Sequence, residues 1–254
     1  MYKVRSGPLQ PRQALWRYFS AKRLIDLLTT GELFFSALSG MSDGLEGALP
    51  PATRERLFRE SIQRGESAES ALLSLESFER HRDQFCVNCW SMNDSESYLM
   101  WEAYTARGCG FAIETTHERL AAALERFEGL IEGDVISYVA HNSESLMLPQ
   151  IGNIYTAITH KDLAYRDERE FRLIYWTKDP KNAAVPVLGK GVRVAVDLDM
   201  LVSRIHLRTK KADHDSPSPS RDVVDVDAAL MIARLVAGNR MACEVRSTQI
   251  VDRS

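Results

Sequence analysis

Hydrophobic and polar residues alternate over 85–90, which is the pattern of a half-buried β-strand. The spacing then changes, because Tyr98, Trp101 and Tyr104 follow one another at intervals of three residues. Residues spaced in this way lie roughly on one face of a helix. A second strand is expected over 109–115, where apolar residues return. The stretch therefore predicts a strand, a polar turn, an aromatic helix and another strand.

This stretch has two interpretations. An aromatic stripe at helical spacing is typical of a buried core. The same stripe beside a polar turn also suits the lining of a ligand pocket, with Ser91 at the end of the first strand. Asp94 or Ser95 is the expected N-cap of the helix. Both interpretations stay open on these residues alone.

The N-terminal segment predicts a compact strand and helix. Residues 15–19 form a strand-like run that contains Arg17 and Tyr18, and Ser20 follows as a plausible N-cap. The apolar stripe of the helix ends at Gly31, where a left-handed residue is expected. A further strand is expected over 33–36, followed by a glycine-rich turn.

The rest of the chain predicts an α+β fold. Residues 50–82 are rich in charge and repeat apolar residues at helical spacing, so we expect two amphipathic helices that form a surface insertion. Residues 210–222 are a polar stretch with serine and proline and predict a mobile loop. The remaining strands and helices alternate without a regular βαβ order. We expect one domain over 1–254, which is long enough to bury a substantial core.

Composition and short motifs exclude only a few classes of function. The chain is 44% hydrophobic and 26% charged with a net charge of −3, so general attraction to nucleic acid is not predicted, although a local basic groove is not excluded. Without a secretory signal or a long apolar run, a cytoplasmic protein with no membrane contact is expected. Cys86 and Cys89 are expected to be ordinary thiols, because residues three apart on a strand point to opposite faces. Glycine-rich nucleotide motifs and a GxSxG elbow are absent from the sequence.

A charged segment over 165–172 leads directly into an apolar strand. If pairing begins near Glu168, then Glu168, Glu170 and Arg172 share one face of that strand. One interpretation is a charged edge strand that resists aggregation. The other is a site for a cationic ligand or transition state, because neighbouring carboxylates need cations to compensate them.

The order of these motifs resembles the bacterial family labelled domain of unknown function 2971. The matching elements are Arg17–Tyr18, 31–36, Asp43 with Glu46, Ser91, Met100–Trp101 with Tyr104, and Glu168, Glu170 and Arg172. Ser42 and Gly44 depart from the family pattern, which has Asn and Pro at these positions, and the tryptophan often seen before the acidic motif is absent.

The order of polar elements is also similar to that of ADP-ribosyltransferases, which have an early arginine, a serine on a middle strand and a late Glu-x-Glu. This resemblance implies a mixed β core of two packed small sheets with flanking helices. It implies NAD as substrate, with catalytic roles for Arg17, Ser91, Glu168 and Glu170. In that superfamily the last glutamate binds the nicotinamide ribose, and the preceding one orients the acceptor nucleophile.

The remaining site expectations combine the two resemblances with the chemistry of the residues. The residues expected to contact NAD are Arg17, Tyr18, Ser36, Tyr98, Trp101 and Tyr104, and those expected to position substrate are Asp43, Glu46 and Arg172. The leading hypothesis is an NAD-dependent ADP-ribosyltransferase without a bound metal, which acts on a protein or nucleic acid as a bacterial toxin or defence effector. Its further partner would be an antitoxin or immunity protein.

Two alternatives remain beside this hypothesis. The first is a non-catalytic module that binds a ligand or a partner. The second is a hydrolase or nuclease that holds a divalent metal with Asp43, Glu46, Glu168 and Glu170. Nicotinamide release, binding without turnover and sensitivity to a chelator would distinguish the three.

Overall fold

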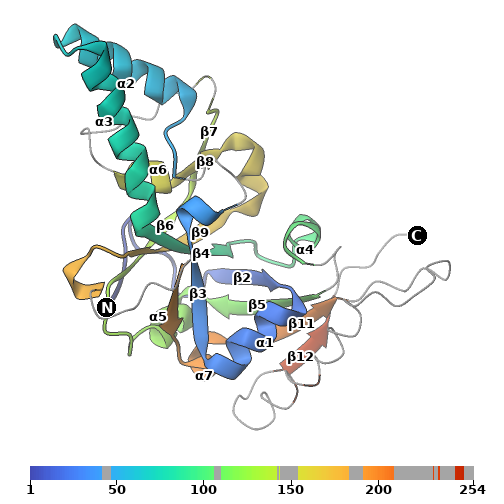
Figure 1. Ribbon diagram of the computed structural model, residues 1–254. Coiled ribbons are helices and arrows are strands. Elements are labelled where there is room, and N and C mark those ends of the chain that lie inside the picture. The colour runs from blue at the N-terminus through green and yellow to red at the C-terminus, as the bar shows by residue number, and fades with distance from the viewer. Residues whose placement is uncertain are drawn as a thin grey trace, which may run out of the picture.

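The fold is α+β, with a large mixed sheet and helices on both of its faces (Figure 1). The computed structural model describes residues 1–41, 47–105, 110–141, 143, 154–182, 191–208, 231, 234 and 244–248. The expected positions Asp43 and Glu46 and the predicted mobile loop at 210–222 lie outside the described residues.

Within these residues, ten strands form one sheet around the central strand β4 (Phe85–Ser91). The main path runs β1 (Tyr2–Val4), β6 (Ile131–Val135), β9 (Glu170–Trp176), β4, β2 (Ala14–Phe19), β5 (Gly110–Thr116), β11 (Arg204–Arg208) and β12 (Glu244–Ser247). A branch from β4 continues through β3 (Glu32–Ala37) to β10 (Gly191–Ala195). The expectation of two separate small sheets is wrong, because hydrogen bonding joins both arms through β4.

Most neighbouring strands of this sheet are antiparallel. The pairs β1 with β6 and β11 with β12 are parallel. A separate parallel pair is formed by β7 (Ser137–Val139) and β8 (His160–Asp162). The strand predicted over 85–90 is confirmed, but it is buried on both faces, because Cys86 and Trp90 belong to one hydrophobic cluster and Phe85 and Val87 to another.

One face of the sheet is covered by α1 (Ala21–Thr30), α5 (His117–Ala123) and α7 (Leu198–Leu201). The predicted apolar stripe of α1 is buried in this layer through Leu24, Leu27 and Leu28. Burying each leucine stabilises the fold by about 1.5–3 kcal/mol. As expected, the helix ends at Gly31, whose φ of 68° lies in the left-handed region that glycine adopts without strain.

The opposite face carries α4 (Tyr98–Tyr104), which packs Met100 and Trp101 against Trp16 and Tyr18 of β2. Ser97 is the N-cap of this helix, and its hydroxyl accepts a hydrogen bond from the Met100 N–H. The predicted cap at Asp94 or Ser95 is therefore wrong.

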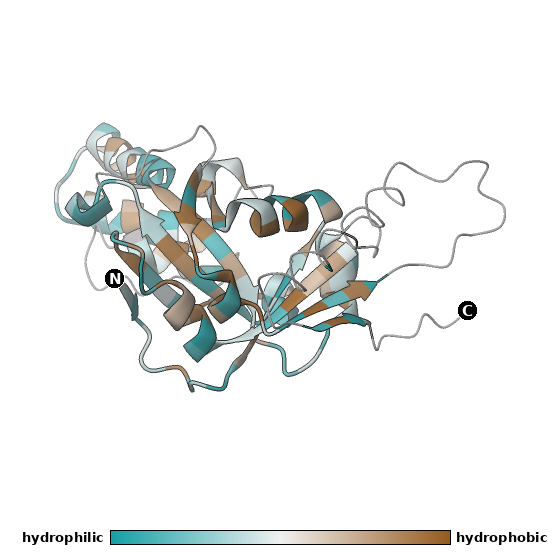
Figure 2. Cartoon of the chain, turned by 90° about the horizontal axis from the view of Figure 1, so that it is seen from below, coloured by the Kyte–Doolittle hydropathy of each residue, from teal (hydrophilic) through white to brown (hydrophobic). Residues whose placement is uncertain are grey.

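The predicted pair of helices over 50–82 is confirmed as α2 (Pro51–Gln63) and α3 (Ala68–Arg80), which extend from one end of the molecule (Figure 1). Leu57 and Leu75 pack against Ala157 of α6 (Ile154–Ile158) and so attach the pair to the body. Figure 2 shows that hydrophobic residues concentrate along the central strands, while hydrophilic residues are frequent on the outer helices.

Candidate functional site

A fork in the sheet lies where β4 changes its partner. Cys86 and Val87 pair with β3, whereas Ser91 pairs with Trp16 of β2. Residues 88–90 are left without a strand partner on this edge among the described strands. On the other edge, β4 pairs with β9 along its whole length. The sheet is therefore open on one side of an otherwise continuous central strand.

Polar side chains bind the backbone at the fork. Arg17 Nη1 donates a hydrogen bond of 2.6 Å to the carbonyl oxygen of Cys89. Asn88 Nδ2 donates to the carbonyl oxygen of Phe34 at 2.9 Å. Buried carbonyl groups need partners, and these two side chains supply them where no neighbouring strand does.

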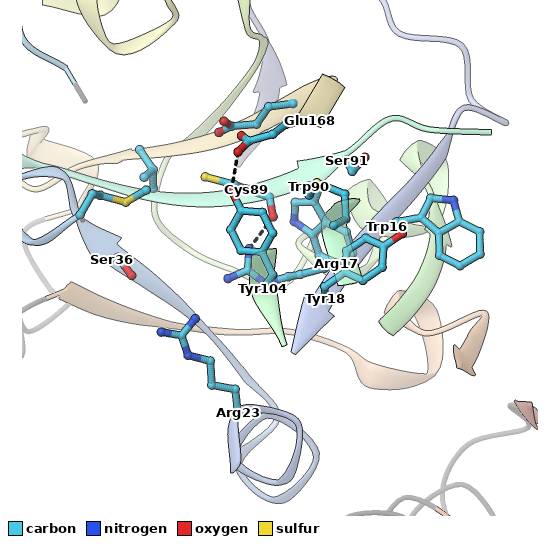
Figure 3. A pocket seen from close by; sticks show the side chains of 14 residues that line it. Trp16, Arg17, Tyr18, Arg23, Ser36, Cys89, Trp90, Ser91, Tyr104 and Glu168 are labelled. Atoms are coloured by element: carbon cyan, nitrogen blue, oxygen red, sulfur yellow. Dashed lines mark hydrogen bonds between the residues drawn. The ribbon is translucent and has the colours of Figure 1, made fainter. Parts of the chain in front are cut away.

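The register of three adjacent strands brings the predicted polar residues together. Ser91 lies opposite Glu170 on one side and Trp16 on the other. Arg17, Ser91 and Glu170 consequently line one pocket of about 110 Å³. Figure 3 shows the pocket, whose other lining residues are Trp16, Tyr18, Arg23, Ser36, Met41, Val87, Cys89, Trp90, Met100, Tyr104 and Glu168.

Glu170, which lines this pocket, is held in a buried ion pair. Arg172 donates to both of its carboxylate oxygens, with Nε at 2.6 Å and Nη2 at 3.0 Å. Both side chains are almost completely buried. Burial opposes the ionised form of Glu170, but Arg172 and Lys161 more than offset it and hold the pKa of this carboxyl well below its ordinary value.

Glu168 lies beside Glu170, although it belongs to another element. It ends the 3₁₀ helix η3 (Leu163–Glu168), and strand pairing begins only at Glu170 after Arg169, whose φ is 44°. The expected pairing from Glu168 is thus wrong, yet the two carboxylates still converge. Lys161 Nζ is 2.7 Å from Glu168 Oε2 and 3.5 Å from Glu170 Oε2. The Tyr104 hydroxyl donates to Glu168 Oε1 at 2.8 Å.

Arg17 brings a positive charge to the fork. Burial lowers the pKa of its guanidinium to about 10, so the group stays protonated at neutral pH. Arg23 extends from α1 toward the same pocket (Figure 3). Two arginines therefore lie across the pocket from the two glutamates.

A second pocket of about 220 Å³ adjoins the first and shares Arg17, Arg23 and Ser36 with it. Phe34 and Arg193 are also among its lining residues. Asp26 and Glu32 pair with Arg193, at 3.0 and 3.6 Å. Residues of β2 and β3 contribute to the lining of both pockets, and Arg17 and Arg23 line both.

The aromatic residues of the predicted site divide into two groups. Tyr18 and Tyr104 line the pocket, whereas Tyr98 lies outside it and stacks on Arg208 at 4.9 Å. Trp101 is completely buried and makes an edge contact with Tyr18, with ring centroids 5.1 Å apart. Trp101 therefore has no ring face to offer a ligand, so its expected stacking role is wrong, whereas a stacking role for the exposed Tyr98 stays a prediction.

Arg172 also differs from the expectation. Its side chain is fully buried, and Nη1 donates to the carbonyl oxygen of Ile158 at 2.7 Å. Arg172 thus positions Glu170 and does not face the pocket as a substrate ligand would. Sequence reasoning missed Lys161 and Arg23, although the need to compensate neighbouring carboxylates was a signal that a further cation exists.

Within the described part of the chain, no group of three or more His, Cys, Asp or Glu side chains is placed to hold a metal ion. The described helices include none that is both long enough and apolar enough to cross a membrane. No protein-family model matches the sequence, and no curated protein matches it.

Proposed function

We propose that the chain is an ADP-ribosyltransferase-like enzyme that takes NAD as substrate and transfers ADP-ribose to a macromolecular acceptor. The observation that carries the proposal is the register of β2, β4 and β9, which joins Arg17, Ser91 and Glu170 in one pocket. These three residues are far apart in the sequence. Their meeting at a fork in the sheet is the arrangement that the resemblance to ADP-ribosyltransferases leads us to expect.

The charges of the two pockets suit a dinucleotide. Arginine is well adapted to phosphate oxygens, and Arg17 and Arg23 lie where the two pockets meet. A pyrophosphate at this point would direct its two nucleosides into separate pockets. The nucleoside on the acidic side would meet Glu170, and Tyr104 offers an aromatic ring there.

The arrangement of Glu170 suits cleavage of the nicotinamide–ribose bond. Breaking this bond develops positive charge on the ribose, which a fixed carboxylate stabilises more in the transition state than in the ground state. Arg172 keeps Glu170 ionised and fixes its orientation. A carboxylate has about four lone-pair directions, and Arg172, Lys161 and the Cys89 thiol use them in this structure, so a ribose hydroxyl would replace the long contact from Lys161 or the weak one from the thiol.

Glu168 is the better candidate for the acceptor side of the reaction. Its side chain is 16% exposed, whereas that of Glu170 is 4% exposed. The hydrogen bond from Tyr104 fixes one of its oxygens at the pocket edge. A nucleophile that enters from solvent would therefore meet Glu168 before Glu170.

The test is release of nicotinamide from NAD by the full chain, with and without candidate acceptors. Glu170→Gln should lower the rate by roughly 10²–10³-fold. Glu170→Asp keeps the charge that Arg172 needs and should lose activity while staying folded. Glu132→Gln is the matched control, because Glu132 is also buried and paired with a lysine and an arginine, but lies outside this pocket. Unchanged nicotinamide release in both Glu170 variants would refute the assignment.

The two alternatives give different results in the same experiments. A binding module would bind NAD or another ligand without releasing nicotinamide. A metal-dependent hydrolase would lose activity with a chelator, but a metal at Glu168 and Glu170 would have to compete with Lys161 and Arg172 for the same oxygens. This competition favours the metal-free proposal.

A further inference from the structure

Two carboxylates of the pocket lining form a compact cluster with two cations. Glu168 and Glu170 lie close enough for Lys161 to contact both, and Arg172 adds the second positive charge. Like charges in such proximity oppose ionisation, and nearby cations remove this penalty. The two negative charges of the cluster are matched by two positive ones.

Lys161 of this cluster is buried and contacts residues of three elements. It lies on β8 opposite Tyr138 of β7, whose hydroxyl accepts a hydrogen bond from the Glu170 N–H at 2.9 Å. The side chain of Lys161 is only 7% exposed. Its ammonium group lies 4.7 Å from the ring centroid of Tyr165 in η3. Lys161 therefore connects β8, η3 and the first residue of β9.

The two cations have different tasks. Arg172 contacts Glu170 through two nitrogens and the Ile158 carbonyl through the third. Lys161 contacts both glutamates, and its shorter contact of 2.7 Å is to Glu168, at the end of η3. The distance between the carboxylates consequently depends on Lys161 more than on Arg172.

We infer that Lys161 is a positioning residue that keeps Glu168 and Glu170 together as an ionised pair in the lining of the pocket. The inference rests on the proposed function in so far as these carboxylates act on NAD. Without the ammonium group, Glu168 and Glu170 lose the cation that both contact, and the two carboxylates repel each other. Glu168 then moves toward solvent, and protonation of Glu170 becomes easier.

The charge of Glu170 also depends on groups from the other elements around it. Burial raises its pKa, whereas Arg172, Lys161 and a hydrogen bond from the Cys89 thiol lower it. The neighbouring titratable or charged groups are Arg17 of β2, Cys89 of β4, Tyr104 of α4, Tyr138 of β7, Lys161 of β8, Glu168 of η3 and Arg172 of β9. Substitution of Lys161 alone leaves the other cations in place.

The experiment compares Lys161→Met, which keeps the aliphatic stem without the charge, with Lys161→Arg, which keeps the charge. Full-length protein labelled with ¹³C at the glutamate carboxyl carbons is titrated by NMR, and the Glu170 signal is assigned by its loss in Glu170→Gln. Lys3→Met is the matched control, because Lys3 pairs with buried Glu132 at 2.9 Å outside the pocket. Nicotinamide release from NAD is measured for each variant as a function of pH.

The titration midpoint of Glu170 should rise by about one unit or more in Lys161→Met and stay near the wild-type value in Lys161→Arg. The acid limb of the pH profile should move in the same direction. A displaced carboxylate should lower kcat by about 100-fold with a smaller change in KM. Lys161→Gln, which retains a hydrogen-bond donor, replaces Lys161→Met if that variant does not fold.

The outcomes separate this inference from the proposed function. If the titration midpoint of Glu170 is unchanged in folded Lys161→Met or Lys161→Gln, the proposed role of Lys161 is overturned, whatever the activity of the variant. Wild-type protein that shows the expected titration but releases no nicotinamide overturns the NAD-dependent reaction and leaves the electrostatic role of Lys161 in place.

Discussion

Arg17 Nη1 donates a hydrogen bond of 2.6 Å to the carbonyl oxygen of Cys89, across the gap where β2 and β3 diverge from β4. The same side chain lines both pockets. Arg17 therefore satisfies a backbone group at the fork and places a positive charge at the centre of the proposed NAD site. The first role can be measured by unfolding experiments and the second by the kinetics of NAD use.

Arg17→Lys should raise the KM for NAD clearly while it lowers the stability of the fold only slightly. Lysine retains the charge but lacks the planar fork that binds a phosphate and a carbonyl together. Loss of one charged hydrogen bond corresponds to an increase in KM of about tenfold or more. Steady-state kinetics and thermal unfolding test this. The control is Arg119→Lys, because Arg119 donates to the carbonyls of Asp199 and Val202 away from the pocket. An equal rise in KM for both variants would contradict the prediction.

His206 should make stability depend on pH in the neutral range. Its Nε2 lies 2.9 Å from Glu114 and its Nδ1 lies 3.3 Å from Glu96, while its ring packs on Trp16. Burial lowers the pKa of this histidine, but the two carboxylates more than offset it and raise the pKa above the ordinary 6.5. A raised pKa stabilises the folded state below the ordinary value, and this contribution is lost as the pH rises through the folded pKa.

The measurement for His206 is the urea midpoint between about pH 6 and about pH 9. Wild-type protein should lose stability over this interval, and His206→Gln should lose less. His81→Gln is the control, because His81 is exposed in η2 (His81–Gln84). A wild-type midpoint that is constant across the interval would show that His206 is not protonated in the folded state.

Local sequence patterns predict the elements of this fold better than they predict the site. Alternation and capping residues indicate strands β2 and β4 and the end of α1 at Gly31, because these signals depend on neighbours in the chain. The cap of α4 is different. Ser97 takes this role while its backbone N–H donates to the Tyr18 hydroxyl at 2.9 Å, and that contact joins residues distant in sequence.

In the site, too, some features follow from neighbours in the chain and others depend on contacts between residues distant in sequence. Glu170 and Arg172 share a face because strand residues two apart do so, and this follows from the sequence. Lys161 comes from another strand, so its position between the carboxylates depends on how β8 and η3 fold back onto β9. The fork depends on the register of β4 with two different strands, which no local pattern specifies.

The two aromatic residues of α4 that lie outside the pocket should respond differently to truncation. Trp101 is completely buried, and its Nε1 donates to Glu96 at 3.1 Å. Trp101→Ala should destabilise the protein by about 3–5 kcal/mol. Tyr98 is 52% exposed, so Tyr98→Ala should change stability by less than about 1 kcal/mol. Urea unfolding measures both, and equal effects would contradict this division of the helix.

Glu170 should make the protein sensitive to acid. Its pKa lies below the ordinary 4.5, because Arg172 and Lys161 outweigh the effect of burial. A depressed pKa stabilises the folded state above the ordinary value, and this contribution is lost as the pH falls from there toward the folded pKa. Wild-type stability should therefore decrease below about pH 4.5 more steeply than that of Glu170→Gln.

The difference in stability between wild type and Glu170→Gln should be largest at neutral pH. Glu170→Gln leaves Arg172 without its carboxylate in a fully buried position, which should cost about 3 kcal/mol or more. The difference between wild type and variant should then shrink as the solution becomes more acidic, because wild-type Glu170 also loses its charge. Urea unfolding of both proteins at a series of pH values measures this difference directly. A gap that stays constant from neutral to acid pH would mean that Glu170 is not the ionised partner of Arg172.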